Sequence, residues 1–137
     1  MSGSTGLAAL ILRLSMGVLF IAHGFYLKLF IFGIDGTIGY FESLGLPGDF
    51  AYATIAGETL AGLGLIFGVL TRLAALSMIP VLAGSIMFAH GDNGWLFSNE
   101  GGGWEFPAFW IVGCVLQVLL GSGPYTLRVP FLNNLEK

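Results

Sequence analysis

Four long apolar segments run through this chain, and its few charged residues cannot cover them. Only 9% of the residues are charged, whereas 55% are hydrophobic, and the mean hydropathy is +0.87. A soluble domain needs a largely polar and charged exterior, which five Lys and Arg with eight Asp and Glu cannot supply for 137 residues. The sequence therefore predicts an integral membrane protein, with the lipid bilayer as its first partner.

Charge and cysteine content exclude several classes of function. The net charge of −3 argues against a nucleic-acid partner, because such binding requires a clustered basic patch. The single cysteine, Cys114, lies inside an apolar segment. One thiol cannot form an internal disulfide, a Cys-x-x-Cys redox pair or a thiolate zinc site.

The lengths of the apolar segments predict the fold. A hydrocarbon core of about 30 Å requires about 20 helical residues to cross it. Four segments approach this length, at about residues 7–32, 50–70, 73–89 and 106–120. We expect an all-α protein: a four-transmembrane-helix bundle that forms one transmembrane domain over residues 1–137.

A short interfacial helix is expected between helices 1 and 2. Asp35 can cap such a helix, and Gly45 can end it. Its Ile38, Phe41 and Leu44 would share one face, as in a segment that lies on a bundle.

The second outer loop, residues 91–104, is rich in glycine and carries Trp95 and Trp104. Tryptophan at this depth favours an anchor at the membrane interface. The alternative is a flexible lid over a site below it.

Small residues predict where the helices approach closely. One stripe on the second span is formed by Gly57, Ala61, Gly64 and Gly68. Small-residue stripes let helix backbones pack against each other in a bilayer, so packing is the favoured interpretation.

The cations predict the orientation. With a cytoplasmic N-terminus, Arg13, Arg72, Arg128 and Lys137 lie at or near the inside, and Lys28 alone lies outside. This satisfies the positive-inside bias, whereas the reverse threading violates it. We expect a multi-pass protein of the cell (inner) membrane with both termini in the cytoplasm, and we interpret Arg13 and Arg72 as ordinary boundary residues.

Five side chains that can act as acids, bases or ligands fall in the outer half of this bundle: His23, Lys28, Glu58, His90 and Glu105. Glu58 is the deepest, since it follows Phe50 by eight residues, or about 12 Å of helix. A charged residue at mid-membrane costs about 2.5 kcal/mol or more, so an intramembrane carboxylate is a candidate functional group by default.

Each of the five also has a simpler interpretation. Glu105 suits the N-terminal end of the fourth helix, where the dipole favours a carboxylate. His90 can be an interfacial residue without a task, and His23 can donate to a backbone carbonyl. Lys28 and Glu58 can form a purely structural ion pair.

The order of several motifs resembles that of the DoxX-like membrane proteins. The resemblance covers about residues 13–127, and the residues that carry it are Arg13, Phe20-Ile21-Ala22-His23-Gly24, Lys28-Leu29, segment 41–47, Glu58, segment 62–72, His90-Gly91, Glu105 and segment 121–125. It implies a four-helix membrane bundle. It also implies an association with quinone-linked respiratory or sulfur-oxidising complexes and with oxidative-stress partners.

The favoured function is a component of a quinone-linked redox or oxidative-stress system, with an outer-half cavity for a quinone-like or other small apolar ligand. His23 and Glu58 are the candidate catalytic acid and base, and Lys28, His90 and Glu105 are candidate ligand-binding residues. Whether the chain is itself an enzyme stays open.

Two alternatives remain. Two histidines and two carboxylates suit a zinc, iron or manganese site between helices, although no Glu-x-x-His pair is present; a haem held by His23 and His90 is a weaker variant. The chain can also be a non-catalytic membrane anchor for a soluble oxidoreductase.

Overall fold

The computed structural model describes residues 2–135, and the regular structure of this part of the chain is entirely helical. Its elements are α1 (Gly3–Phe20), the π-helix η1 (Ile21–Ile31), α2 (Gly33–Ser43), α3 (Phe50–Phe67), α4 (Thr71–Ser85), the π-helix η2 (Ile86–His90), the 3-10 turn η3 (Gly91–Asn93), α5 (Glu105–Leu120) and the 3-10 turn η4 (Asn133–Leu135). The predicted all-α architecture is confirmed.

The expected spans agree with these helices to within a few residues at each end. Three helices are long and apolar enough to cross a membrane, judged by length and composition: Gly3–Ile31, Phe50–Phe67 and Thr71–Asn93. The fourth, α5, is apolar but shorter, with 16 residues. The short helix predicted between the first two spans is α2, which begins two residues before Asp35.

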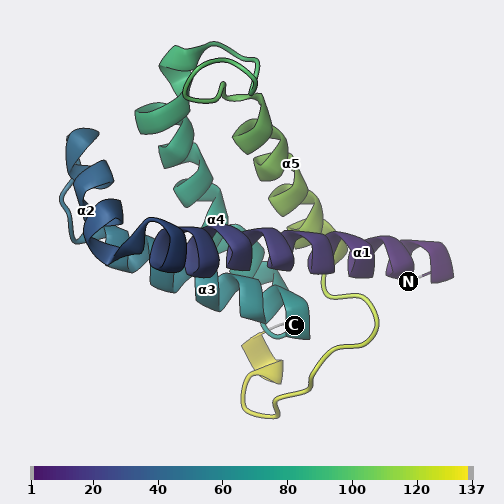
Figure 1. Cartoon of the computed structure of the whole chain (residues 1–137). Helices are drawn as coiled ribbons and strands as arrows, with labels where there is room; N and C mark the ends of the chain where they lie inside the picture. The colour runs from purple at the N-terminus through teal and green to yellow at the C-terminus, as the bar shows by residue number, and fades with distance from the viewer. Residues whose placement is uncertain (1, 136–137) are drawn as a thin grey trace.

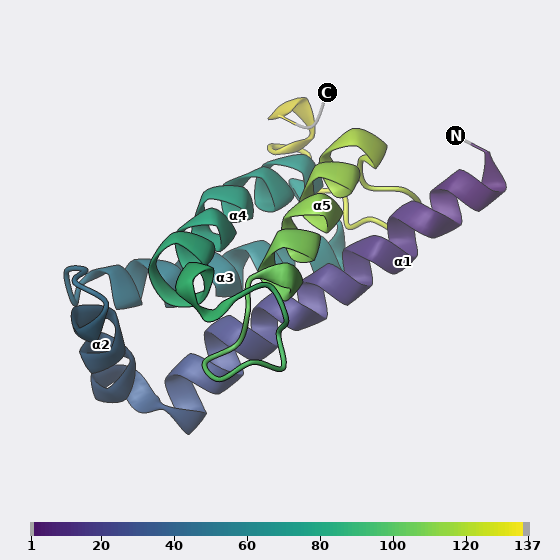
Figure 2. The ribbon, with the colours of Figure 1, turned by 90° about the horizontal axis from the view of Figure 1, so that it is seen from above.

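The helices form two pairs. The first helix, made of α1 and η1, packs along α3, and α4 packs along α5. Figure 1 shows α4 and α5 rising together from α1 and α3, joined at their far end by the loop that precedes α5. Both ends of the described chain lie at one end of the molecule, and α2 lies at the other (Figure 2).

Glycines make the contact between α1 and α3. A Cβ atom added at Gly17 would lie 2.9 Å from the carbonyl oxygen of Gly62, and one added at Gly62 would lie 3.0 Å from that of Gly17. Both distances are too short for any larger residue, so these two backbones touch. The helix approach in this pair therefore depends on Gly62, which lies outside the predicted stripe.

Two glycines of the predicted stripe on α3 pack instead against α4. A Cβ atom at Gly57 would lie 3.6 Å from Cε of Met78, and one at Gly64 would lie 3.5 Å from Cβ of Ala74. Ala61 is buried in the same core. Gly68 ends α3 in the left-handed conformation, with φ of 69°.

Arg13 corrects one sequence interpretation, because its side chain is not exposed as that of an ordinary boundary residue would be. Its side chain is fully buried. Nη1 donates to the carbonyl oxygens of Leu65 (3.1 Å) and Ile66 (3.2 Å), and Nη2 to those of Pro124 (2.9 Å) and Tyr125 (3.0 Å). The guanidinium thus joins α1 to the end of α3 and to the segment that follows α5.

Replacing Arg13 by Met should destabilise the protein by about 3 kcal/mol or more, because the carbonyl oxygens of Ile66, Pro124 and Tyr125 lose their charged donor. Unfolding in detergent, followed by circular dichroism during a titration with dodecyl sulfate, measures the change. Arg128→Met is the matched control, because Arg128 is exposed. Equal stability of the two variants would contradict the role assigned to Arg13.

Candidate functional site

A cavity of about 1150 Å³ lies between η1, α2, α3, α4, η2 and α5. Its walls are mainly apolar, and six of the chain's twelve phenylalanines line it: Phe32, Phe41, Phe50, Phe88, Phe97 and Phe106. Four of the five predicted site residues also line it: His23, Lys28, Glu58 and His90. Helices distant in sequence therefore bring these side chains to one space.

Lys28 and Glu58 form an ion pair in the wall of this cavity. Nζ of Lys28 lies 2.8 Å from Oε2 of Glu58, and the side chains are 19% and 8% exposed, respectively. Nζ also donates to the carbonyl oxygen of His23, over 3.3 Å. The pair joins η1 to the middle of α3.

The π-helical conformation of η1 places His23 and Lys28 on one face. Residues five apart are about 140° from each other around an α-helix, since each residue turns it by about 100°. In a π-helix the hydrogen bonds run from residue i to i+5, so such residues lie about one turn apart. The bond from Lys28 to the His23 carbonyl spans this same interval. Without the wider turn, the two side chains would not point into the same cavity.

Gly24 lets Glu58 approach η1 closely. A Cβ atom added at Gly24 would lie 2.5 Å from Cβ of Glu58 and 2.9 Å from its Oε2. Any larger residue at this position would therefore displace the carboxylate. The absence of a side chain at Gly24 is a condition of the ion pair.

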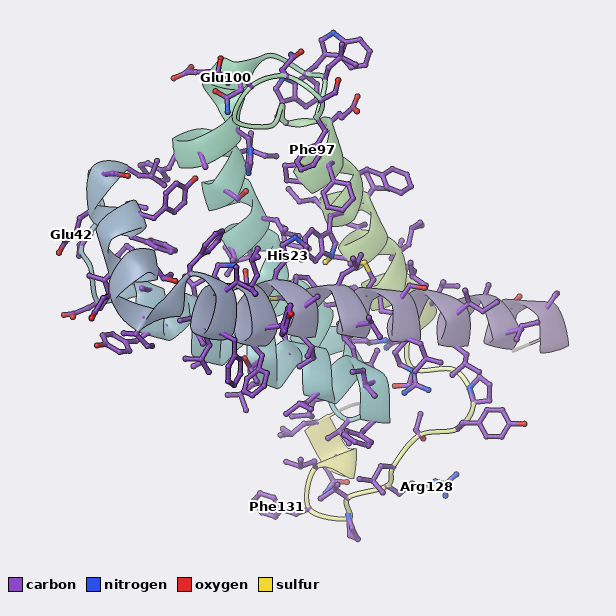
Figure 3. The ribbon with its side chains drawn as sticks, viewed as in Figure 1. His23, Glu42, Phe97, Glu100, Arg128 and Phe131 are labelled. Carbon is purple, nitrogen blue, oxygen red and sulfur yellow. The ribbon has the colours of Figure 1, made fainter. Side chains whose placement is uncertain are left out.

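His23 is held by its own helix and by an aromatic neighbour. Its Nδ1 lies 2.9 Å from the carbonyl oxygen of Leu19 and must donate, since a carbonyl oxygen only accepts. The imidazole also forms a T-shaped contact with the ring of Trp110, with ring centroids 5.0 Å apart. Figure 3 shows His23 and Phe97 on the side of α1 from which α4 and α5 rise.

The loop over the cavity is tied to His90. Nδ1 of His90 donates to the carbonyl oxygen of Gly102 over 2.8 Å, and Nδ2 of Asn93 donates to the same oxygen over 3.0 Å. Backbone bonds close the loop further, among them those from Gly103 N to Leu96 O and from Trp104 N to Gly94 O. These bonds hold Phe97 in the cavity wall. Trp95 is 59% exposed, as suits an interface anchor.

Glu105 is not among the residues that line the cavity. It is the first residue of α5, and its backbone N–H donates to the carbonyl oxygen of Trp95. A carboxylate suits this helix end, as its simpler interpretation states.

The part of the chain that the structure describes contains no preformed set of metal ligands. Within residues 2–135, no group of three or more His, Cys, Asp or Glu side chains is placed to hold a metal ion.

Several wall residues were not singled out from the sequence. Trp110 stacks on Phe20 (4.7 Å between centroids) and contacts Phe106 (5.6 Å), which in turn contacts Phe97 (5.1 Å). Thr37 of α2 donates to the carbonyl oxygen of Lys28 over 2.8 Å and so fixes α2 against the end of η1. Aromatic residues are common throughout this sequence, so their number alone does not indicate which of them line a cavity.

Comparison with known proteins agrees with the membrane architecture. The chain is 37% identical over 87 residues to a protein of Bacillus subtilis (strain 168) named "Putative oxidoreductase CatD", covering 64% of this chain and 63% of that protein. It therefore spans less than two thirds of CatD. It is 33% identical over 96 residues to "Inner membrane protein YqjF" of Escherichia coli (strain K12), covering 66% of this chain and 72% of that protein. No solved structure matches the chain.

The family model for DoxX matches residues 8–91. This segment includes His23, Lys28, Glu58 and His90, and it ends before Glu105. The resemblance seen in the sequence is confirmed: the chain belongs to the DoxX family of membrane proteins.

Proposed function

We propose that this DoxX-family protein is an inner-membrane component of a quinone-linked redox or oxidative-stress system, and that its cavity binds a quinone-like or other small apolar ligand. The observation that carries the proposal is the Lys28–Glu58 pair in the wall of a largely aromatic cavity. Ionisable groups within a membrane that face a cavity commonly mark a ligand or proton pathway. The names "Putative oxidoreductase CatD" and "Inner membrane protein YqjF" support the same setting.

The cavity suits such a ligand in size and chemistry. Small-molecule pockets commonly measure about 300–1,000 Å³ and are mostly apolar, with a few polar groups that fix orientation. A volume of about 1150 Å³ accommodates one ring and part of an alkyl tail. The Lys28 ammonium would hold a ring oxygen, and Glu58 and His23 would exchange protons there. The electrons would come from a partner oxidoreductase.

We further propose that α5 is the fourth span and that both termini face the cytoplasm. Arg128 lies on the side of the molecule opposite to Glu100 (Figure 3). Arg13 donates to carbonyl oxygens in the segment just before Arg128, so the two arginines lie at the same end of the molecule. This segregation satisfies the positive-inside bias.

Filling the cavity should abolish binding without unfolding the protein. Gly84 lines the cavity, and nothing lies within 4 Å of a Cβ atom added there, so Gly84→Leu should occupy the space. We expect the affinity for a short-chain quinone, measured by quenching of tryptophan fluorescence, to fall at least tenfold. Gly39→Leu is the control: a Cβ atom there is equally free, and Gly39 is not in the lining. If the quinone shows no saturable binding, or binds both variants alike, the proposal fails.

The ion pair should matter for the ligand beyond its effect on folding. Lys28→Met leaves the buried Glu58 carboxylate unpaired and should destabilise the protein by about 3 kcal/mol or more, and Glu58→Met, which leaves the partly buried Lys28, should destabilise it less. The double variant leaves no unpaired charge at the two positions, so it should recover most of the lost stability. Quinone affinity should nevertheless remain at least tenfold weaker. Wild-type affinity in a folded double variant would show that the pair is only structural.

Labelling of single cysteines tests the orientation. In a Cys114→Ala background, Ser98→Cys lies in the exposed outer loop and Ser4→Cys lies near the N-terminus. A membrane-impermeant maleimide added to spheroplasts should label position 98 at once and position 4 only after lysis. The opposite pattern would reverse the proposed threading.

A further inference from the structure

The Lys28–Glu58 pair leaves two hydrogen-bonding positions unfilled. Oε2 of Glu58 accepts from Lys28, whereas no group within residues 2–135 donates to Oε1. Lys28 uses two of its three N–H groups, on Oε2 of Glu58 and on the carbonyl oxygen of His23. Within the same described residues its third N–H has no acceptor. Both side chains line the cavity, so one acceptor and one donor remain in its wall.

The histidines add acceptors to the same space. His23 and His90 each donate from Nδ1 to a backbone carbonyl, of Leu19 and Gly102 respectively. In a neutral imidazole whose Nδ1 carries the proton, Nε2 is an acceptor. The lining also carries donors, among them Nε1 of Trp110, which has no hydrogen-bond partner within residues 2–135, so the groups of the ion pair decide which ligand fits there.

A hydroxyl group fits the free positions at the ion pair. It donates one hydrogen bond, to Oε1 of Glu58, and accepts another, from Nζ of Lys28. A quinone carbonyl accepts from Lys28 but leaves Oε1 of Glu58 without a donor. A buried charged acceptor that stays unpaired is costly, and sites built for a hydroxyl reject analogues that lack it.

We infer that the cavity selects the hydroxylated form of an aromatic ring, a quinol or a related phenol, over the corresponding quinone. This inference rests on the proposed function and names the substrate class of the same site. The wall of aromatic rings formed by His23, Trp110, Phe106 and Phe97 supplies a surface for a planar ring. Because tighter binding of one redox form shifts the equilibrium toward it, the bound couple would be held in its reduced state.

Three ligands of one carbon skeleton test the inference on the purified full-length protein under anaerobic conditions. They are a short-chain alkyl benzoquinol, its dimethyl ether and the matching benzoquinone. The ether keeps the oxygen acceptors but has no O–H donor. We expect the quinol to bind at least tenfold more tightly than either of the others, which corresponds to about 1.4 kcal/mol.

The variant E58Q tests which residue makes the distinction. The amide that replaces the carboxylate can donate to a carbonyl, so the preference for the quinol should disappear or reverse. Any preference against the ether that remains in E58Q measures the bulk of its methyl groups. E105Q is the matched control, because Glu105 is outside the cavity lining, and it should keep the wild-type order.

The outcomes separate the two proposals. If the quinone binds as tightly as the quinol, or if E58Q keeps the full preference, the hydroxyl selection is wrong while the ligand cavity stands. If none of the three ligands binds saturably, the proposed function fails together with this inference. If E58Q does not fold, the three-ligand series on the wild-type protein still decides whether the cavity prefers the quinol.

Discussion

A charged side chain that lies within hydrocarbon must find its partners inside the protein, because lipid supplies none. Two cations on the first helix meet this requirement on the same neighbour, α3. Arg13 donates to the carbonyl oxygens of Leu65 and Ile66, and Lys28 binds the carboxylate of Glu58. Between these two fixed points the backbones touch at Gly17 and Gly62. The pairing of the first helix with α3 is thus fixed in register at three levels, and the remaining helices pack on this pair.

The site follows from a departure from regular geometry in this pair. A plain α-helix would place His23 and Lys28 about 140° apart, so only one of them could face Glu58. The π-helical turn of η1 brings both toward the cavity, and Gly24 makes room for the carboxylate beside them. A locally widened helix next to polar residues is frequent at functional sites. The continuation of the first helix past Phe20 therefore has two roles, as part of a span and as one wall of the cavity.

Hydropathy and turn residues were sufficient to predict the helices, because span length and glycine stops are local properties of the sequence. The same local reasoning misplaced Arg13. Its partners Pro124 and Tyr125 follow α5, and no pattern near Arg13 shows that this distant segment returns to cover it. For the same reason we grouped Glu105 with the other four candidates from the sequence, whereas it is not among the residues that line the cavity. Its position at the start of a span gives its depth, but not the face of the helix on which it lies.

Arg13, which is buried, and Lys28, which is partly buried, differ in which residues could replace them. Arg13 satisfies backbone carbonyls, which every sequence carries at those positions, so an apolar residue there would leave those of Ile66, Pro124 and Tyr125 without this donor. Lys28 instead pairs with the side chain of Glu58, which an apolar residue could replace. Exchanging a buried ion pair for two apolar residues of similar volume is often neutral or stabilising. Stability therefore accounts for Arg13 but gives little reason to place Lys28 and Glu58 in the membrane. Their position in the wall of a cavity, with hydrogen-bonding capacity left over, supplies the reason if a polar group of a ligand completes the pair.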